Sequence, residues 1–223
     1  MQITAVGTEE PFEPRRWQDA AKVCVSLVFD ATSVLMTDRG ESRTLLISSE
    51  KNEFCDPQLE EYLQFQANLD IQFEGMVNTS KWWAVDQMYW AEEWKMLGAL
   101  TAAEGMKNGS FLPDPSAGGN AYKKMENLSA STGSIFDSWM IREQITETLI
   151  RKQHDYGHHN IARFGRQGLL VRVHDKIARL KNLMLNNSSP NNESISDTYT
   201  DIVGYSAIGI MWERGWFGLE LEL

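Results

Sequence analysis

The stretch GLLVRVHDKIARLKNLMLNNSSPNNESISDTYTDIVGYSAIGI, at residues 168–210, decides the fold of this chain. It contains two segments whose apolar residues recur at helical spacing, separated by a turn rich in asparagine and serine. This pattern predicts one helix over 169–186 and a second over 193–212, with Asn192 as the N-cap of the second. Because the connection between them is short, we expect the two helices to be antiparallel neighbours.

The second of these helices carries acidic residues at four-residue steps. Glu193, Asp197 and Asp201 share one stripe, because four residues are just over one helical turn. Like charges at this spacing repel by roughly 0.2–0.5 kcal/mol per pair on an exposed helix. The helix dipole favours acids in the first turn but does not reach Asp201. The stripe is therefore a solvated face, a cation site or a set of salt bridges to basic residues, and spacing alone leaves these alternatives open.

The first helix adds one carboxylate among basic side chains. Asp175 has the spacing of an ordinary salt bridge to Arg179. An antiparallel pairing also brings Asp175 close to the level of Asp197 and Asp201. Carboxylates that converge from two facing helices are the usual way in which a helix bundle binds a hard divalent cation. The basic neighbours of Asp175 are Arg172, Lys176 and Arg179.

The rest of the chain is predicted to be mainly helical. Asp56 and Pro57 form a typical helix start, and the segment HDYG, at 154–157, ends a helix with glycine. Segments 23–29 and 42–49 have strand-like composition; helix is favoured for the first and a short strand for the second. Residues 110–121, rich in proline and glycine, predict a linker. We therefore expect a mostly helical N-terminal extension over 1–130 and a helical core over 131–223. The further predicted helices span 15–38, 56–69, 80–104 and 134–153.

Composition limits the classes of partner. The net charge of −10 repels a nucleic-acid backbone, which argues against binding to duplex nucleic acid. The N-terminal residues lack the apolar run of a signal peptide, and no segment approaches the apolar length of a membrane span. Cys24 and Cys55 lack metal-type spacing, which indicates buried, reduced thiols. These features predict a cytoplasmic protein that does not bind membranes.

The histidines of the chain are clustered between residues 154 and 174, and His154 and His174 are each followed by aspartate. This arrangement suggests an alternative, a metal-dependent phosphohydrolase of the His-Asp type. The chain after the cluster is short for the distant last aspartate of such enzymes. No cysteine accompanies the histidines, so a structural zinc site is disfavoured.

Three ordered motifs carry a family resemblance. They are KxHDYG at 152–157, RxxDKxxRLxNL at 172–183 and NESIxDTxxDIxxY at 192–205. Together they resemble the first nucleotide modification associated domain, a phage-associated family grouped with the all-α, MazG-like nucleoside triphosphate pyrophosphohydrolases. The resemblance covers about residues 135–212. It implies a MazG-like four-helix bundle core, a homo-oligomer (dimer or tetramer) and, for a phage protein, a location in the host cytoplasm.

The resemblance also implies a reaction, the hydrolysis of a nucleoside triphosphate or deoxynucleoside triphosphate to monophosphate and pyrophosphate. Mg²⁺, or alternatively Mn²⁺, would be bound by acidic residues. The second MazG-like motif is matched by Glu193 and Asp197, but the first, ExxE, is replaced by Asp175 alone, with Arg172 where a glutamate is expected. The implied metal ligands are Asp175, Glu193, Asp197 and Asp201, and Glu193 and Asp197 are also the implied catalytic residues. The implied substrate contacts are Arg172, Lys176, Arg179, Lys152 and Tyr156. Tyr205 is a second candidate, beside Tyr156, for packing against the nucleobase.

Two alternatives to hydrolysis are kept. In the first, the protein binds nucleotides without hydrolysing them. In the second, it binds a partner protein through the tryptophan-rich segment 82–94. Packing in the core is the favoured role of those tryptophan rings.

Overall fold

The computed structural model describes residues 13–37, 57–81, 86–107, 110–111, 133–186 and 190–222. These ranges contain helices and no strand, which confirms the predicted mainly-α class. None of the described helices is long and apolar enough to cross a membrane. The helices are α1 (Trp17–Thr37), α2 (Pro57–Thr79), α3 (Gln87–Lys107), α5 (Gly133–Tyr156), α6 (His159–Ala162), α7 (Gly165–Leu185) and α8 (Ile195–Glu213).

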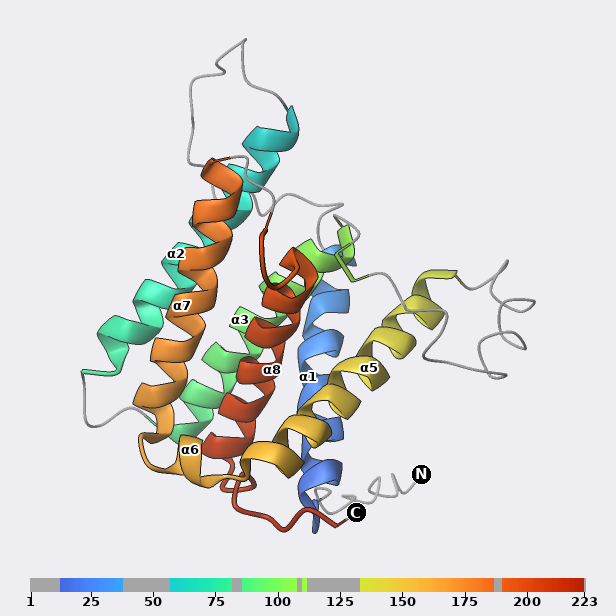
Figure 1. The fold of residues 1–223 in the computed structure, drawn as a ribbon, viewed down its shortest axis with the longest axis vertical. Coiled ribbons are helices and arrows are strands. Elements are labelled where there is room, and N and C mark those ends of the chain that lie inside the picture. Colours follow the sequence, from blue (N-terminus) through green and yellow to red (C-terminus); the bar gives the residue numbers. More distant parts are fainter. Residues whose placement is uncertain are drawn as a thin grey trace, which may run out of the picture.

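Helix α8 is the centre of the packing. It lies against α3, α7 and α1 and more lightly against α5, while α2 packs against α3 and α7 (Figure 1). The predicted antiparallel pair is α7 and α8, and its inward residues Val173, Ile177 and Leu180 are buried as expected. The buried cluster joins side chains from both sides of residue 130. The division of roles between 1–130 and 131–223 stays a prediction, although the two parts share this core.

Several sequence-based boundaries change in the structure. Segment 23–29 is helical, as predicted, because Ala21, Cys24 and Val28 are buried at helical spacing on α1. The helix from Pro57 continues to Thr79, well beyond the predicted end. The predicted strand at 42–49 and most of the predicted linker lie outside the described residues, as does Cys55. Cys24 is a free, buried thiol, and burial raises its pKa to about 12, so it is unreactive at neutral pH.

A buried ion pair joins the start of α7 to the end of α8. The Arg166 guanidinium donates two hydrogen bonds to the Glu213 carboxylate, of 2.7 and 2.6 Å. Only 2% of the Glu213 side chain is exposed. The same guanidinium lies over the Trp90 ring of α3, 4.3 Å from its centroid. Arg166 therefore ties three helices of the core together.

Glycines allow α3 and α8 to approach closely. A methyl group added at Gly209 of α8 would overlap the indole ring of Trp94 on α3. One added at Gly98 of α3 would lie 2.8 Å from the Cβ atom of Ser206 on α8. The helix that carries the candidate site is thus fixed against α3 by contacts that leave no room for a side chain.

We expect Gly209→Ala to lower the free energy of unfolding by about 1–3 kcal/mol, because the added methyl overpacks the α3–α8 contact. The matched control is Gly75→Ala in α2, where nothing lies within 4 Å of the added Cβ. That change removes backbone freedom from the unfolded chain and should stabilise by about 0.5–1 kcal/mol. Urea unfolding followed by circular dichroism measures both, and equal stabilities of the two variants would contradict the packing argument.

Candidate functional site

A cavity of about 360 Å³ lies where α5, α6, α7 and α8 meet the first residue of α1. This volume is at the lower end of the roughly 300–1,000 Å³ of small-molecule sites. Several residues predicted from the sequence line it together. They are Lys152 and Tyr156 of α5, Arg172 and Lys176 of α7, and Glu193, Asp201 and Tyr205 at or on α8.

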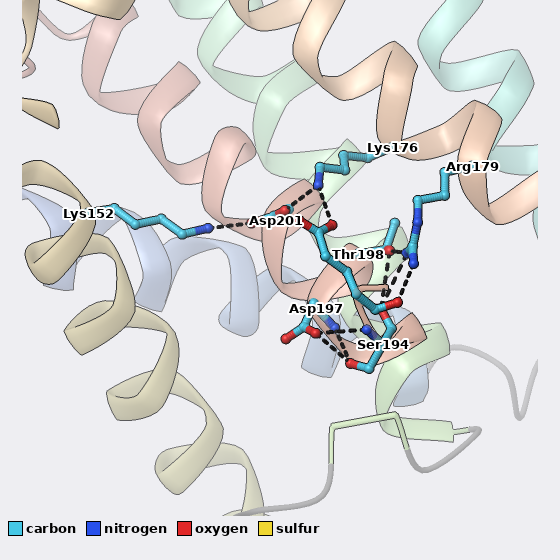
Figure 2. Close-up of polar contacts among 8 residues, drawn as sticks. Lys152, Lys176, Arg179, Ser194, Asp197, Thr198 and Asp201 are labelled. Carbon is cyan, nitrogen blue, oxygen red and sulfur yellow. Dashed lines mark hydrogen bonds and ion pairs between the residues drawn. The ribbon is translucent and has the colours of Figure 1, made fainter. Parts of the chain in front are cut away.

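Asp201 is the centre of the charged part of this cavity. Its carboxylate accepts from the Lys152 ammonium at 2.5 Å and from the Lys176 ammonium at 2.7 Å (Figure 2). Lys176 also reaches the Glu193 carboxylate, at 2.9 Å. The side chain of Asp201 is only 11% exposed, whereas that of Lys152 is half exposed. Helices α5, α7 and α8 are therefore linked by an alternating row of charges.

The surroundings of this row shift two pKa values. Burial alone would raise the pKa of Asp201, but the hydrogen bonds and charges of Lys152 and Lys176 outweigh it and hold the pKa below its usual 3.8. Burial alone would lower the pKa of Lys176, but Asp201 and Glu193 outweigh it and raise the pKa above the usual 10.5. Both Asp201 and Lys176 are thus charged at neutral pH.

We expect the stabilising effect of Asp201 to depend on pH. The pKa of Asp201 is lower in the folded state than in the unfolded chain. Its contribution to the free energy of unfolding is therefore fully present above the pKa of the unfolded chain, and it is lost as the pH falls through the pKa of the folded state. The stability difference between wild type and Asp201→Asn should be constant from neutral pH to about pH 5 and shrink below the usual carboxylate pKa. Urea unfolding over a pH series measures it. Carboxyl NMR supplies the check: a titration of Asp201 above 3.8 would contradict the assignment, and Lys152→Met should raise the observed pKa.

Asp197 has a local structural role at the start of α8. Ser194, not the predicted Asn192, is the N-cap of this helix, because its Oγ accepts from the Asp197 backbone N–H at 3.0 Å. The Asp197 carboxylate in return accepts from the backbone N–H and Oγ of Ser194, at 2.9 and 2.8 Å (Figure 2). This reciprocal pair is a capping box. Glu193 consequently lies before the helix rather than on its predicted acidic stripe.

Arg179 also supports this helix start. Its guanidinium donates to the Glu193 and Ser194 carbonyl oxygens and to the Thr198 hydroxyl (Figure 2). Arg179 is not among the residues that line the cavity. Its predicted contact with a phosphate stays a prediction, while the contacts it makes in the structure order the loop carrying Glu193.

The structure does not gather the four predicted metal ligands. In the described part of the chain, no group of three or more histidine, cysteine, aspartate or glutamate side chains is placed to hold a metal ion. Asp175 is exposed on α7 and does not line the cavity, while Asp197 is engaged in the capping box. Glu193 and Asp201 do converge, but on the ammonium group of Lys176. Binding of magnesium itself stays a prediction.

The histidines are spread over separate environments. His154 lies beside Asp155, with 3.1 Å between Nδ1 and the carboxylate, and both are exposed. The rings of His158 and His159 contact each other at a tilt of 47°, and His174 contacts Phe73 of α2 at a tilt of 34°. Among the residues that the structure describes, these side chains form no metal site, so the His-Asp alternative gains no support.

The tyrosines and several residues that were not predicted also line the cavity. Tyr156 is 68% exposed, which excludes a core role for it, and Tyr205 is half-buried. Sequence reasoning missed Trp17, Gly204 and Ile208, which also line the cavity. The last two follow Asp201 at helical spacing and could have been found from the period of α8. Trp17 could not, because only the packing of α1 brings it here.

The comparisons with known proteins concern the C-terminal part of the chain. Residues 152–212 match the family described as nucleotide modification associated domain 1. This match supports the resemblance noted from the three motifs and covers less than half of the chain. No curated protein and no solved structure is significantly similar to the chain. The relation to MazG-like enzymes stays a prediction.

Proposed function

We propose that the cavity binds a nucleotide through its phosphate groups. The observation that carries this proposal is the convergence of Lys152, Arg172 and Lys176 on one cavity. These residues come from α5 and α7 and lie within the segment that matches a nucleotide modification associated domain. Lysine ammonium groups and an arginine guanidinium are the side chains best suited to phosphate oxygens.

The charges of the cavity favour a polyanion. Asp201 and Glu193 compensate the two lysines, and Arg172 adds a positive charge at the wall. An approaching phosphate competes with the two carboxylates for the lysine ammonium groups. Tyr156 and Tyr205 offer aromatic surface on which the base or sugar packs.

We propose further that the bound nucleotide is a triphosphate, with a deoxyribonucleotide favoured, and that it is hydrolysed to monophosphate and pyrophosphate. Two carboxylates, Glu193 and Asp201, already share one cation, the Lys176 ammonium. When that ammonium contacts phosphate instead, the two carboxylates suit Mg²⁺ or Mn²⁺ as ligands. When bound, the metal neutralises phosphate charge and acidifies a water molecule. Glu193, which is half-exposed, is the residue that would orient the attacking water.

A binding module without turnover is the second candidate. It is favoured by the observation that the Asp201 carboxylate is already satisfied by two lysines. Of the four predicted carboxylates, Glu193 and Asp201 line this cavity, and both of them contact Lys176. In this version the phosphates are bound by the basic side chains alone.

One experiment separates the two candidates. The purified chain is incubated with the ribo- and deoxynucleoside triphosphates and Mg²⁺ or Mn²⁺, with and without a chelator, and pyrophosphate release is measured. Calorimetry with the same nucleotides and with inorganic tripolyphosphate measures binding. Chelator-sensitive release supports hydrolysis, and binding without release supports the module. Absence of any binding would overturn the phosphate site itself.

We propose further that the protein is cytoplasmic, which its composition and the resemblance support, and that it forms a dimer or tetramer, which the resemblance supports. Light scattering of the purified chain tests the second.

A further inference from the structure

A second cavity, also of about 360 Å³, adjoins the first one between α5 and α8. Both cavities are lined by Ile145, Thr148 and Lys152 of α5 and by Glu193, Thr200 and Asp201 at or on α8. Only the second is lined by Phe111, Ile141, Gln144, Ser196 and Asp197. The ion pair between Lys152 and Asp201 therefore lies where the two cavities meet. When the Lys152 ammonium contacts a phosphate instead, one ligand can extend from the first cavity into the second.

The two cavities follow each other along α5 and α8. On α5, Gln144 of the second cavity comes before the shared Lys152, and Tyr156 of the first cavity comes after it. On α8 the order is the same, with Ser196 before Tyr205, and in Figure 1 the two helices run in the same direction. From Gln144 to Tyr156 the axis of α5 advances by about 18 Å, given the rise of 1.5 Å per residue. The two cavities together thus suit a longer and larger ligand than the first cavity alone.

The two cavities differ in charge. The first is lined by three basic and two acidic side chains, and the second by one basic and three acidic side chains. A polyphosphate is therefore attracted to the first cavity and repelled by the second. The nucleoside part of a nucleotide is uncharged and is not repelled. The charge difference thus favours a nucleotide whose phosphates lie in the first cavity and whose nucleoside lies in the second.

The second cavity also offers hydrogen-bonding groups that carry no charge. They belong to Gln144, Thr148, Ser196 and Thr200. Thr200 is half-buried, and its hydroxyl makes no hydrogen bond to any residue that the structure describes. The helical residues Thr146 and Ser206, in contrast, donate to the carbonyl oxygen four residues earlier. Phe111 and Ile141 add apolar surface, so the cavity combines polar groups for a sugar with an apolar wall for a base.

We infer that the second cavity is the nucleoside subsite, with the sugar at Thr200 and the base between Gln144 and the side chains of Ile141 and Phe111. The triphosphate extends from there past Lys152 into the first cavity. This inference rests on the proposed binding of nucleotide phosphates in the first cavity. It assigns the base to the second cavity in place of the tyrosine surface of the first.

This orientation agrees with the proposed reaction. It places the α-phosphate beside Glu193 and Asp201, the carboxylates that line both cavities. A water molecule gives a proton to Glu193 and adds to the α-phosphorus. The bond from the α-phosphorus to the bridging oxygen breaks, and pyrophosphate leaves with that oxygen toward Lys176 and Arg172. The reverse orientation would direct the terminal phosphate toward the acidic second cavity.

The test compares Gln144→Trp with Gln153→Trp. Both glutamines are half-buried on α5, but Gln144 lines only the second cavity and Gln153 only the first. Calorimetry measures the affinity for inorganic tripolyphosphate and for each ribo- and deoxynucleoside triphosphate. We expect Gln144→Trp, which fills the second cavity, to weaken the preferred nucleotide by about 10-fold or more and to leave tripolyphosphate unchanged. Gln153→Trp should weaken both ligands.

A smaller change keeps the inference testable if the tryptophan variants fold poorly, which their melting temperatures reveal. Thr200→Val keeps the shape of the side chain and removes the hydroxyl. We expect it to weaken the preferred nucleotide by about 3- to 10-fold and to leave tripolyphosphate unchanged. Thr79→Val is the matched control, because Thr79 is a half-buried helical threonine that lines neither cavity. It should bind both ligands like the wild type.

The outcomes separate this inference from the proposed function. If tripolyphosphate binds but Gln144→Trp and Thr200→Val have wild-type affinity for every nucleotide, the phosphate site stands and the nucleoside subsite is rejected. It is also rejected if Gln153→Trp weakens nucleotides but not tripolyphosphate, since the base then lies in the first cavity. If neither tripolyphosphate nor any nucleotide binds to the wild type, the proposed function and the nucleoside subsite both fall.

Discussion

Asp201→Asn is expected to reduce metal-dependent pyrophosphate release by about 100-fold or more, because it removes one of the two carboxylates that converge in the cavity. The substitution keeps the size of the side chain and removes its charge. Lys152 and Lys176 then lose a compensating anion, with Lys176 keeping Glu193. Inorganic tripolyphosphate should therefore bind as tightly as to the wild type or more tightly.

The measurement combines a pyrophosphate assay with calorimetry on the same preparation. Asp70→Asn is the matched control, because Asp70 also pairs with a lysine, Lys181, at 2.8 Å but lies on the exposed contact between α2 and α7. It should leave both release and binding unchanged. Pyrophosphate release by Asp201→Asn within a few fold of the wild type would reject Asp201 as a metal ligand. Weaker tripolyphosphate binding by the variant would contradict the argument that the Asp201 carboxylate competes with phosphate for the lysines.

Arg166→Ala is expected to lower the free energy of unfolding by about 3–5 kcal/mol, because it leaves the Glu213 carboxylate buried without its partner. The change also removes the contact between the guanidinium and the Trp90 ring. For a chain of this length, the melting temperature should fall by about 2–4 °C for each kcal/mol lost. Calorimetric melting and urea unfolding measure the two quantities.

Two control variants test whether the loss of stability in Arg166→Ala comes from leaving a buried charge without its partner. Lys181→Ala breaks an exposed ion pair and should cost less than about 1 kcal/mol. Combining Arg166→Met with Glu213→Leu removes both charges, and this double variant should be more stable than Arg166→Ala. A small effect of Arg166→Ala, similar to that of Lys181→Ala, would show that Glu213 reaches solvent.

Local patterns were sufficient to predict the helices that carry the site. The apolar period of 169–186 and 193–212 and the short turn between them predicted α7 and α8 as neighbours, because both signals come from adjacent residues. The four-residue step also singled out Asp201. It placed Glu193 on the helix wrongly, because Ser194 is the N-cap of the capping box and α8 begins only at Ile195. Spacing cannot show whether an aspartate near a helix start contacts a ligand or its own backbone.

The partners of the site residues were beyond local patterns. Lys152 meets Asp201 across 49 residues of sequence, through the packing of α5 beside α8. Trp17 reaches the cavity because α1 packs on both α5 and α8. Such contacts depend on the three-dimensional arrangement of whole helices, which the period of a single helix does not contain. The family resemblance named Lys152 but offered nothing for Trp17.

The row of alternating charges across α5, α7 and α8 has a consequence for which anions are retained. Each lysine ammonium already has a carboxylate beside it, so binding is an exchange of one anion for another rather than capture by free cations. A singly charged anion gains little from such an exchange, whereas the proposed triphosphate ligand would contact both lysines and Arg172 at once. The affinity of the site should therefore increase with the charge of the ligand, so that triphosphates bind more tightly than monophosphates whichever base they carry.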